Sequence, residues 1–261
     1  MKHYALVGQN IEYSLSPKIH QMIYEHLGKE AEYKLISVAP EHFESILPQL
    51  FELDGFNVTK PYKNCITGYL DINMNGLGPV NTVMWYEGQK FGYNTDYYGF
   101  NTSLVRLINP ENLSALVLGA GGVADSVVRN LMKLGAQVYI YNRTPEKAET
   151  LAKTRGATAV LDKRGKFDIV VNCSSCGLNP GENMGQGIDF SETKLAFDTI
   201  YTETEFLKAA KAGGAALVSD GLDMLVYQAI YAAELFFEKD IEEIDALADS
   251  ISAELRLNHM P

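Results

Sequence analysis

A cluster of glycines between two apolar stretches constrains this chain most. Gly119, Gly121 and Gly122 stand in the stretch VLGAGGVA, after a buried-looking strand and before a helix. The first glycine makes a tight turn, the second lets the backbone approach a ligand, and Ala124 takes the third small position, where the helix packs closely. The N-terminus of the helix offers N–H donors to an anion. This context predicts a dinucleotide site formed by Gly119, Ala120, Gly121, Gly122, Val123 and Ala124.

The end of the next strand indicates which dinucleotide is bound. That strand, YIY, ends in Asn142, Arg143 and Thr144, and Lys147 lies one helical step further on. An NAD site usually has Asp or Glu here, whereas Arg143 can pair with a 2′-phosphate through its planar guanidinium, helped by Lys147. The pattern favours NADP over NAD. The alternative is an ordinary exposed arginine at the start of a helix.

Strand and helix patterns alternate along most of the chain, which predicts an α/β protein with two units. The first unit has strand patterns at 3–8, 33–38, 56–59, 80–85 and 91–93. Its first helix has Ser16 as N-cap and Pro17 at the first helical position, and a second helix over 40–51 is broken or bent at Pro48. The second unit begins near Asn112 and has the Rossmann-like pattern of a parallel sheet. A helix near 98–108 joins the units, an irregular loop spans 177–187, and helices over 221–237 and 241–255 close the chain.

Composition excludes several classes of partner. The chain has 261 residues and a formal net charge of −11, without a basic cluster, so nucleic acid and anionic membranes are poor partners. No apolar stretch approaches membrane-spanning length. Three cysteines indicate a reducing compartment and thus a cytoplasmic location.

The C-x-x-C at 173–176 has no second cysteine pair. We therefore favour the interpretation that these are small residues beside a cofactor over the interpretation that they form a redox pair. The histidines show no ligand spacing, which predicts no metal site: His3, His20, His26, His42 and His259.

Polar side chains gather where strands of the first unit end. Lys63 follows the strand over 56–59, Asn81 begins another strand, and Asp96 follows a third. Since ligands of open α/β sheets bind outside the carboxyl ends of the strands, these groups suit a polyhydroxylated anionic substrate. For hydride transfer to a ketone, Lys63 can donate the proton and Asp96 can orient it, although Asp96 can also be a helix N-cap. Lys60 is expected at the surface.

Two serines precede the first helix. Ser14 and Ser16 are spaced i and i+2, so their hydroxyls can point the same way and bind a carboxylate, helped by the helix N-terminus. Helix capping is the alternative and, on this stretch alone, the favoured one.

Taken together, the motifs resemble those of the shikimate dehydrogenase family over nearly the whole chain. The matching stretches are YSLSPKIH, GFNVTKPYK, GPVNT, YNTDYYGF, GAGGVA, NRTPEKA and GLDMLVYQAIYAAELF. The resemblance implies reversible reduction of 3-dehydroshikimate to shikimate by NADPH. It implies Lys63 and Asp96 as catalytic residues. Carboxylate ligands would be Ser14, Ser16 and Tyr201, and ring-hydroxyl ligands Thr59, Lys63, Asn81, Asp96 and Gln228. Gly221 and Met224 would border the nicotinamide. Quinate or aminoshikimate dehydrogenation and a catalytically weak NADP-binding sensor are the alternative functions.

The resemblance also implies how the domains are divided. The closing helices pack back on the substrate domain, which then comprises residues 1–98 and 222–261, while residues 99–221 form the NADP-binding domain. We expect a monomer or a homodimer. The chain departs from the family pattern at Asp125, which stands where the family usually has Arg, and we expect its negative charge to be unhelpful beside phosphates.

Overall fold

The computed structural model describes residues 1–177 and 181–258, so His259 and part of the irregular loop predicted at 177–187 lie outside the described residues. The chain divides into two compact units. Unit 1 comprises residues 1–99 and the stretch from Val226 onward, and unit 2 comprises Phe100–Leu225. The boundaries fall within two helices, α3 (Thr95–Val105) and α7 (Leu222–Phe237). They differ from the boundaries expected from the sequence by one residue in α3 and by four in α7.

Unit 1 is built on a mixed sheet of six strands in the order β2-β1-β3-β5-β6-β4. The strand β1 pairs in parallel with β2 and β3, whereas β5 runs antiparallel to both β3 and β6. The elements of this unit before α3 are β1 (Lys2–Gly8), α1 (Ser16–His26), β2 (Ala31–Ser37), η1 (Pro40–His42), α2 (Phe43–Leu50), β3 (Gly55–Val58), η2 (Ile66–Tyr69), β4 (Ile72–Asn73), β5 (Thr82–Tyr86) and β6 (Gln89–Tyr93).

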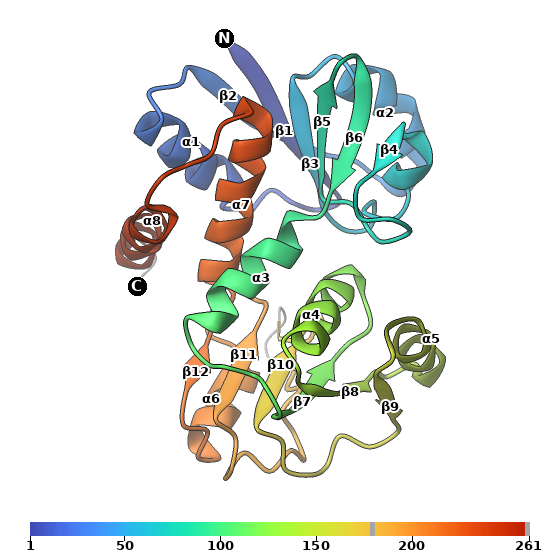
Figure 1. The fold of residues 1–261 in the computed structure, drawn as a ribbon, viewed down its shortest axis with the longest axis vertical. Helices are drawn as coiled ribbons and strands as arrows, with labels where there is room; N and C mark the ends of the chain where they lie inside the picture. Colours follow the sequence, from blue (N-terminus) through green and yellow to red (C-terminus); the bar gives the residue numbers. More distant parts are fainter. Residues whose placement is uncertain (178–180, 259–261) are drawn as a thin grey trace. The chain divides into compact units, whose positions relative to one another are not determined.

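The two faces of this sheet are covered by different helices, because successive side chains of a strand point to opposite faces. Ala5 and Val7 of β1 belong to a buried cluster with Leu47 of α2. Tyr4 stacks instead on Phe236 of α7, with ring centroids 4.4 Å apart. Figure 1 shows α2 and α7 on either side of the sheet, and α8 (Ile244–Asn258) ends the described chain. The C-terminal helices therefore pack on unit 1.

Unit 2 has a six-stranded sheet in the order β12-β11-β10-β7-β8-β9, and every pairing in it is parallel. Its elements are β7 (Ser114–Leu118), α4 (Gly122–Lys133), β8 (Gln137–Tyr141), α5 (Pro145–Arg155), β9 (Thr158–Val160), β10 (Ile169–Asn172), β11 (Leu195–Asp198), α6 (Glu205–Ala212) and β12 (Val218–Ser219). This is the strand order of the Rossmann fold, with the switch point between β7 and β10. The predicted fold class is confirmed.

Both faces of this sheet are buried, as expected for a parallel sheet. Ala115 and Val117 of β7 pack with Val127 of α4 in one cluster. Leu116 of β7 packs with Phe206 of α6 in the cluster on the other face. Because β7 is central and buried on both faces, the glycine turn that follows it begins from a rigid support.

Three local expectations were wrong. Leu15 holds the N-cap position of α1, and Ser16 is the first helical residue, so Ser16 is not the N-cap. The predicted helix over 40–51 divides between η1 and α2, while Pro48 lies inside α2. The short strands β4 and β9 were missed, because two and three residues are too few to show an alternating pattern.

His20 is a buried histidine without a hydrogen-bond partner for Nδ1. Its ring stacks on Tyr33 with centroids 3.9 Å apart, and burial lowers the pKa of His20 to about 3. The unfolded chain binds a proton at His20 below about pH 6.5, whereas the folded chain does not. The free energy of unfolding therefore falls as the pH drops from about 6.5 towards 3, by about 1.4 kcal/mol per pH unit from this group.

We predict that His20→Phe reduces the acid destabilisation of the fold. Between about pH 6 and about pH 4, the variant should lose about 2 kcal/mol less unfolding free energy than the wild type. Urea unfolding at a series of pH values measures this difference. His26→Phe, at an exposed position of the same helix, is the control. Parallel pH profiles for wild type and His20→Phe would contradict the prediction.

Candidate active site

The chain turns sharply after β3 and so positions Lys63. The backbone N–H of Thr59 donates to Val7 O at 2.8 Å, and the Lys60–Pro61 peptide bond that follows is cis. Tyr62 is buried, and its hydroxyl donates to a backbone carbonyl oxygen at 2.5 Å. This anchoring holds the backbone on which Lys63 stands.

The two lysines of this stretch have different surroundings. Lys60 is exposed, as expected, whereas the Lys63 ammonium donates to Asp96 Oδ2 at 2.5 Å. The side chains of Lys63 and Asp96 are only 14% and 10% exposed. Asn81 Nδ2 donates to the other carboxylate oxygen, Asp96 Oδ1, at 3.0 Å. The structure thus brings together the lysine, the carboxylate and the amide that the sequence placed at three separate strand ends.

Asn81 also fixes the start of α3. Its Oδ1 accepts from the backbone N–H of Thr95 at 2.7 Å, and its Nδ2 donates to Thr95 Oγ1 at 3.0 Å and lies 3.4 Å from Gln228 Oε1. Since α3 begins at Thr95, Asp96 lies in the first turn and is not an N-cap. The capping alternative for Asp96 is therefore wrong, and its carboxylate faces Lys63 and Asn81.

Ser14 lies two residues before Ser16, the first residue of α1, and the N-cap residue Leu15 makes no side-chain cap. Ser14 Oγ donates to Ser16 Oγ at 3.1 Å and accepts from the Ser16 backbone N–H at 3.2 Å. The structure records no side-chain cap for α1 and no acidic residue in its first turn. The N-terminal end of this helix thus keeps its partial positive charge beside two hydroxyl groups.

The glycine turn brings the backbone close to the end of β10 and leaves open space in front of α4. Gly119 has φ +113°, and a Cβ there would meet the backbone of Cys173 at 3.1 Å. Gly121 precedes α4 and is exposed, with open space where its Cβ would be, and α4 has no side-chain cap. Ala124 is completely buried in the cluster under the helix, as its small size predicts. Gly122 and Val123 form the first turn of α4, and Ala120 lies in the loop before it.

The residues after β8 form an exposed cationic group. Arg143, Thr144 and Lys147 are exposed, and Asn142 Nδ2 donates to Thr144 O at 2.9 Å. In the part of the chain that the structure describes, neither Arg143 nor Lys147 has a carboxylate partner. Both cations remain available for a phosphate.

Asp125 does not present an unbalanced charge beside the glycine turn. Its Oδ1 accepts from both Nε and Nη2 of Arg155, each at 2.7 Å. The side chains of Asp125 and Arg155 are 12% and 25% exposed. The expectation that Asp125 opposes phosphate binding loses its physical basis, because Arg155 from the end of α5 neutralises the carboxylate.

The remaining predicted residues lie in different units. Gly221 is buried, and a Cβ there would lie 2.5 Å from Thr199 O, so this close approach requires glycine. Met224 is 6% exposed and belongs to a buried cluster of unit 2, and Tyr201 lies in the same unit outside that cluster. Gln228 and the half-buried Thr59 belong to unit 1.

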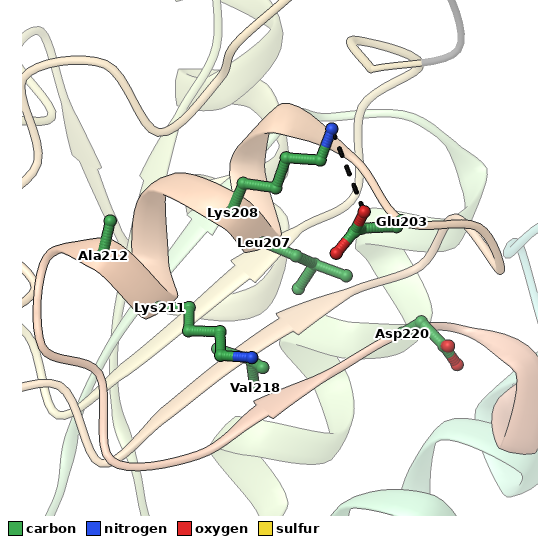
Figure 2. A pocket seen from close by; sticks show the side chains of 7 residues that line it. All are labelled: Glu203, Leu207, Lys208, Lys211, Ala212, Val218 and Asp220. Carbon is green, nitrogen blue, oxygen red and sulfur yellow. Dashed lines mark ion pairs between the residues drawn. The ribbon is translucent and has the colours of Figure 1, made fainter.

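A pocket on unit 2 contains none of the predicted residues. Figure 2 shows it between α6 and β12, lined by Glu203, Leu207, Lys208, Lys211, Ala212, Val218 and Asp220. Lys208 lies 3.9 Å from Glu203, so the charges that line the pocket are partly paired. Nothing about this pocket indicates a ligand.

The described residues include no group of three or more His, Cys, Asp or Glu side chains arranged to hold a metal ion. No helix among them is long and apolar enough to cross a membrane. Burial raises the pKa of Cys173 and Cys176, which disfavours the reactive thiolate form.

Sequence reasoning missed a set of buried polar residues beside Asn81. Asn57 looked like an outward-facing residue of an alternating strand, but it is 4% exposed. Its Nδ2 donates to Thr82 Oγ1 at 2.9 Å, and its Oδ1 accepts from the Tyr33 hydroxyl at 2.7 Å. The available signal was that Asn and Thr interrupt strands that are otherwise apolar.

The fold and the site together define a class. A parallel six-stranded sheet with a glycine turn at its central strand, joined to an α/β unit with a partly buried lysine–aspartate pair, is the architecture of a two-domain α/β oxidoreductase. Residues 6–83 match the family described as "Shikimate dehydrogenase substrate binding domain". Residues 104–175 match the family described as "Shikimate / quinate 5-dehydrogenase".

Individual relatives agree with these matches. The shikimate dehydrogenase (NADP(+)) of Aquifex aeolicus is 36% identical over 247 residues, which cover 89% of this chain and 90% of the relative. A crystal structure of shikimate dehydrogenase from the same organism has a TM-score of 0.88 at 33% identity, covering 96% of this chain and 97% of that one. Shikimate 5-dehydrogenase of Thermus thermophilus, in complex with NADP(H) and shikimate, has a TM-score of 0.85 at 33% identity, covering 96% and 100%. The chain belongs to the shikimate dehydrogenase family.

We predict that the Asp125–Arg155 ion pair stabilises unit 2. Arg155→Ala leaves a mostly buried carboxylate without its counter-charge, which should lower the free energy of unfolding by about 1–3 kcal/mol. Urea unfolding of the variant measures this loss, and adding Asp125→Asn should recover part of it. Arg164→Ala is the control, because the Arg164–Asp162 pair is 77% and 52% exposed and should contribute little. Equal losses for the two arginine variants would contradict the prediction.

Proposed function

We propose that the chain catalyses the NADP-dependent, reversible reduction of 3-dehydroshikimate to shikimate. The observation that carries this proposal is the Lys63–Asp96–Asn81 cluster, in which a partly buried ammonium is held on a carboxylate whose other oxygen is held by an amide. Family membership supports the same reaction, because its curated relatives are NADP-dependent shikimate dehydrogenases.

The residues present fit an NADP molecule. The uncapped N-terminus of α4 and the open space at Gly121 suit a pyrophosphate, and Arg143 and Lys147 suit a 2′-phosphate. The residues that would hold the dinucleotide are the turn at 119–124, Asn142, Arg143, Thr144, Lys147, Gly221 and Met224. When bound, the dinucleotide supplies the hydride or takes it back.

Lys63 donates the proton in one direction of the reaction and accepts it in the other. As the ketone becomes a hydroxyl group, its oxygen takes a proton from Lys63 Nζ, and in the reverse direction neutral Lys63 removes that proton. Asp96 holds the ammonium in place and accepts a hydrogen bond from a ring hydroxyl of the substrate. Asn81 keeps the Asp96 carboxylate oriented through the 3.0 Å contact to Oδ1.

Neutral donors bind the rest of the substrate. Ser14 and Ser16, at the uncapped N-terminus of α1, donate to the substrate carboxylate. Thr59, Asn81 and Gln228 contact the ring hydroxyls. Tyr201 is also assigned to the carboxylate; burial raises the pKa of Tyr201, so its hydroxyl remains a donor at neutral pH.

The cellular setting is part of the proposal. Three free cysteines fit a reducing compartment, so we propose a cytoplasmic location. The oligomeric state, monomer or homodimer, stays a prediction.

Steady-state turnover of shikimate and of quinate, each with NADP⁺ and with NAD⁺, tests the proposed reaction and its nearest alternative, quinate dehydrogenation. A higher kcat/KM for quinate than for shikimate would favour that alternative.

We predict that Lys63→Ala lowers turnover by roughly 10²–10⁴-fold, the range for loss of general acid catalysis. The affinity for NADP should hardly change, because its proposed ligands belong to other segments of the chain. Lys60→Ala, at the exposed position three residues earlier, is the matched control and should leave both quantities nearly intact. Turnover and NADP affinity of both variants measure this, with circular dichroism to confirm folding. If Lys63→Ala kept more than about a tenth of wild-type turnover, Lys63 would not be the proton donor.

We predict that Arg143→Asp weakens NADP binding by about 1–3 kcal/mol, because a charge-assisted hydrogen bond to the 2′-phosphate is replaced by repulsion. Binding of NAD, which lacks this phosphate, should change much less. Isothermal titration with both dinucleotides measures the two effects. Lys153→Asp makes the same change of charge at an exposed position on α5 and serves as the control. An equal loss of affinity for NADP and NAD would remove Arg143 from the 2′-phosphate site.

A further inference from the structure

A series of buried hydrogen bonds crosses unit 1 and ends at the proposed catalytic cluster. The Tyr33 hydroxyl on β2 donates to Asn57 Oδ1 on β3 at 2.7 Å. Asn57 Nδ2 donates to Thr82 Oγ1 on β5 at 2.9 Å, and Thr82 Oγ1 donates to Asn81 Oδ1 at 3.0 Å. Asn81 Nδ2 then donates to Asp96 Oδ1 at 3.0 Å. Four members of the series are buried, with at most 7% of the residue exposed: Asn57, Thr82, Asn81 and Asp96.

Tyr33 orients the Asn57 amide, whose Nδ2 also donates to Asn81 O at 3.1 Å. Burial raises the pKa of Tyr33 far above its usual value, so the phenol keeps its proton and is a permanent donor. It therefore sets Asn57 Oδ1 towards itself and Asn57 Nδ2 towards Thr82. Because Thr82 Oγ1 already accepts from this amide, its single proton is available to Asn81 Oδ1 at 3.0 Å, which is closer than Thr95 Oγ1 at 3.2 Å.

The orientation of the Asn81 amide matters for Asp96. With Oδ1 facing the Thr82 hydroxyl and the Thr95 backbone N–H, its Nδ2 faces the carboxylate. A flipped amide would place its oxygen against the Asp96 carboxylate and its NH₂ group against the Thr95 N–H donor. Both contacts would be repulsive, and burial makes such unpaired polar groups costly.

We infer that Thr82 and Tyr33 are positioning residues for this reaction, because their hydroxyl groups fix the Asn81 amide that holds the Asp96 carboxylate beside Lys63. Among the described residues, no hydrogen bond joins either side chain to Lys63 or Asp96, so each acts through Asn81. The inference rests on the proposed function, in which Asp96 orients the Lys63 ammonium.

Thr82 allows a matched pair of substitutions. Thr82→Val keeps the shape of the side chain but removes the hydroxyl, whereas Thr82→Ser keeps the hydroxyl and removes the methyl group. If the hydroxyl orients Asn81, Thr82→Val should lower kcat for shikimate oxidation about 5- to 30-fold, as expected for the loss of one or two buried hydrogen bonds. Thr82→Ser should stay within about threefold of the wild type, because the donor is retained. NADP affinity should be unchanged in both variants.

The outcomes separate positioning from packing. A side chain that only fills space would make Thr82→Ser the poorer enzyme, because it leaves a cavity that Thr82→Val does not. Equal kcat for the two variants, or a lower kcat for Thr82→Ser, would overturn the role of Thr82. Thermal unfolding of both variants checks that each is folded under the conditions in which kcat is measured. A wild type without turnover of shikimate would instead contradict the proposed function, which is a distinguishable failure.

Tyr33→Phe tests the start of the series. Without the phenol, Asn57 Oδ1 loses its donor, and the amide keeps its orientation only through the bond from Nδ2 to Asn81 O at 3.1 Å. Where the amide turns its oxygen towards Thr82, the Thr82 proton has a second acceptor and leaves Asn81. We expect kcat to fall about 3- to 10-fold with little change in NADP affinity. The exposed Tyr86, changed to Phe, is the control. Unchanged kcat in Tyr33→Phe would overturn the role of Tyr33.

Discussion

The buried amide of Asn81 is the interaction on which the candidate active site depends. Its oxygen accepts from the first N–H group of α3, and its nitrogen donates to the Asp96 carboxylate. Buried polar groups must be hydrogen-bonded, so a single amide ties the end of the sheet to the start of the helix. The position of Asp96, and through it the position of Lys63, follows from that contact.

The proposed substrate and cofactor are anions, although the net charge of the protein is −11. Local groups can bind them, because helix N-termini and hydroxyl groups attract an anion without adding formal charge. At α1 and α4 the N-terminal turns have no side-chain cap, so their partial positive charge stays available. Among the residues proposed to bind substrate or cofactor, the formal cations are Lys63, which is paired, and Arg143 and Lys147, which are exposed.

The sequence was informative wherever a function depends on a single local pattern. The glycine turn and the strand-end positions of Lys63, Asn81 and Asp96 were predicted because turns and strand ends leave local signals. The contact between Asn57 and Thr82 was not predictable, because it depends on the register of β3 against β5, in which these residues face each other. The Tyr33 contact depends further on β1 lying between β2 and β3. Strand order and register are properties of the whole sheet.

The proposed proton transfer from Lys63 requires that the Asp96 carboxylate stay stabilised after the proton has left. While Lys63 is protonated, its charge balances that of Asp96 in a site where both are mostly buried. Once the proton has moved to the substrate, the Asp96 carboxylate keeps its charge without a cation beside it, which is costly in a buried site unless other donors remain. The Asn81 amide is such a donor, and it is neutral, so its hydrogen bond persists through the reaction. A neutral donor therefore suits this position better than a second lysine or arginine, whose charge would oppose the return of the proton to Lys63.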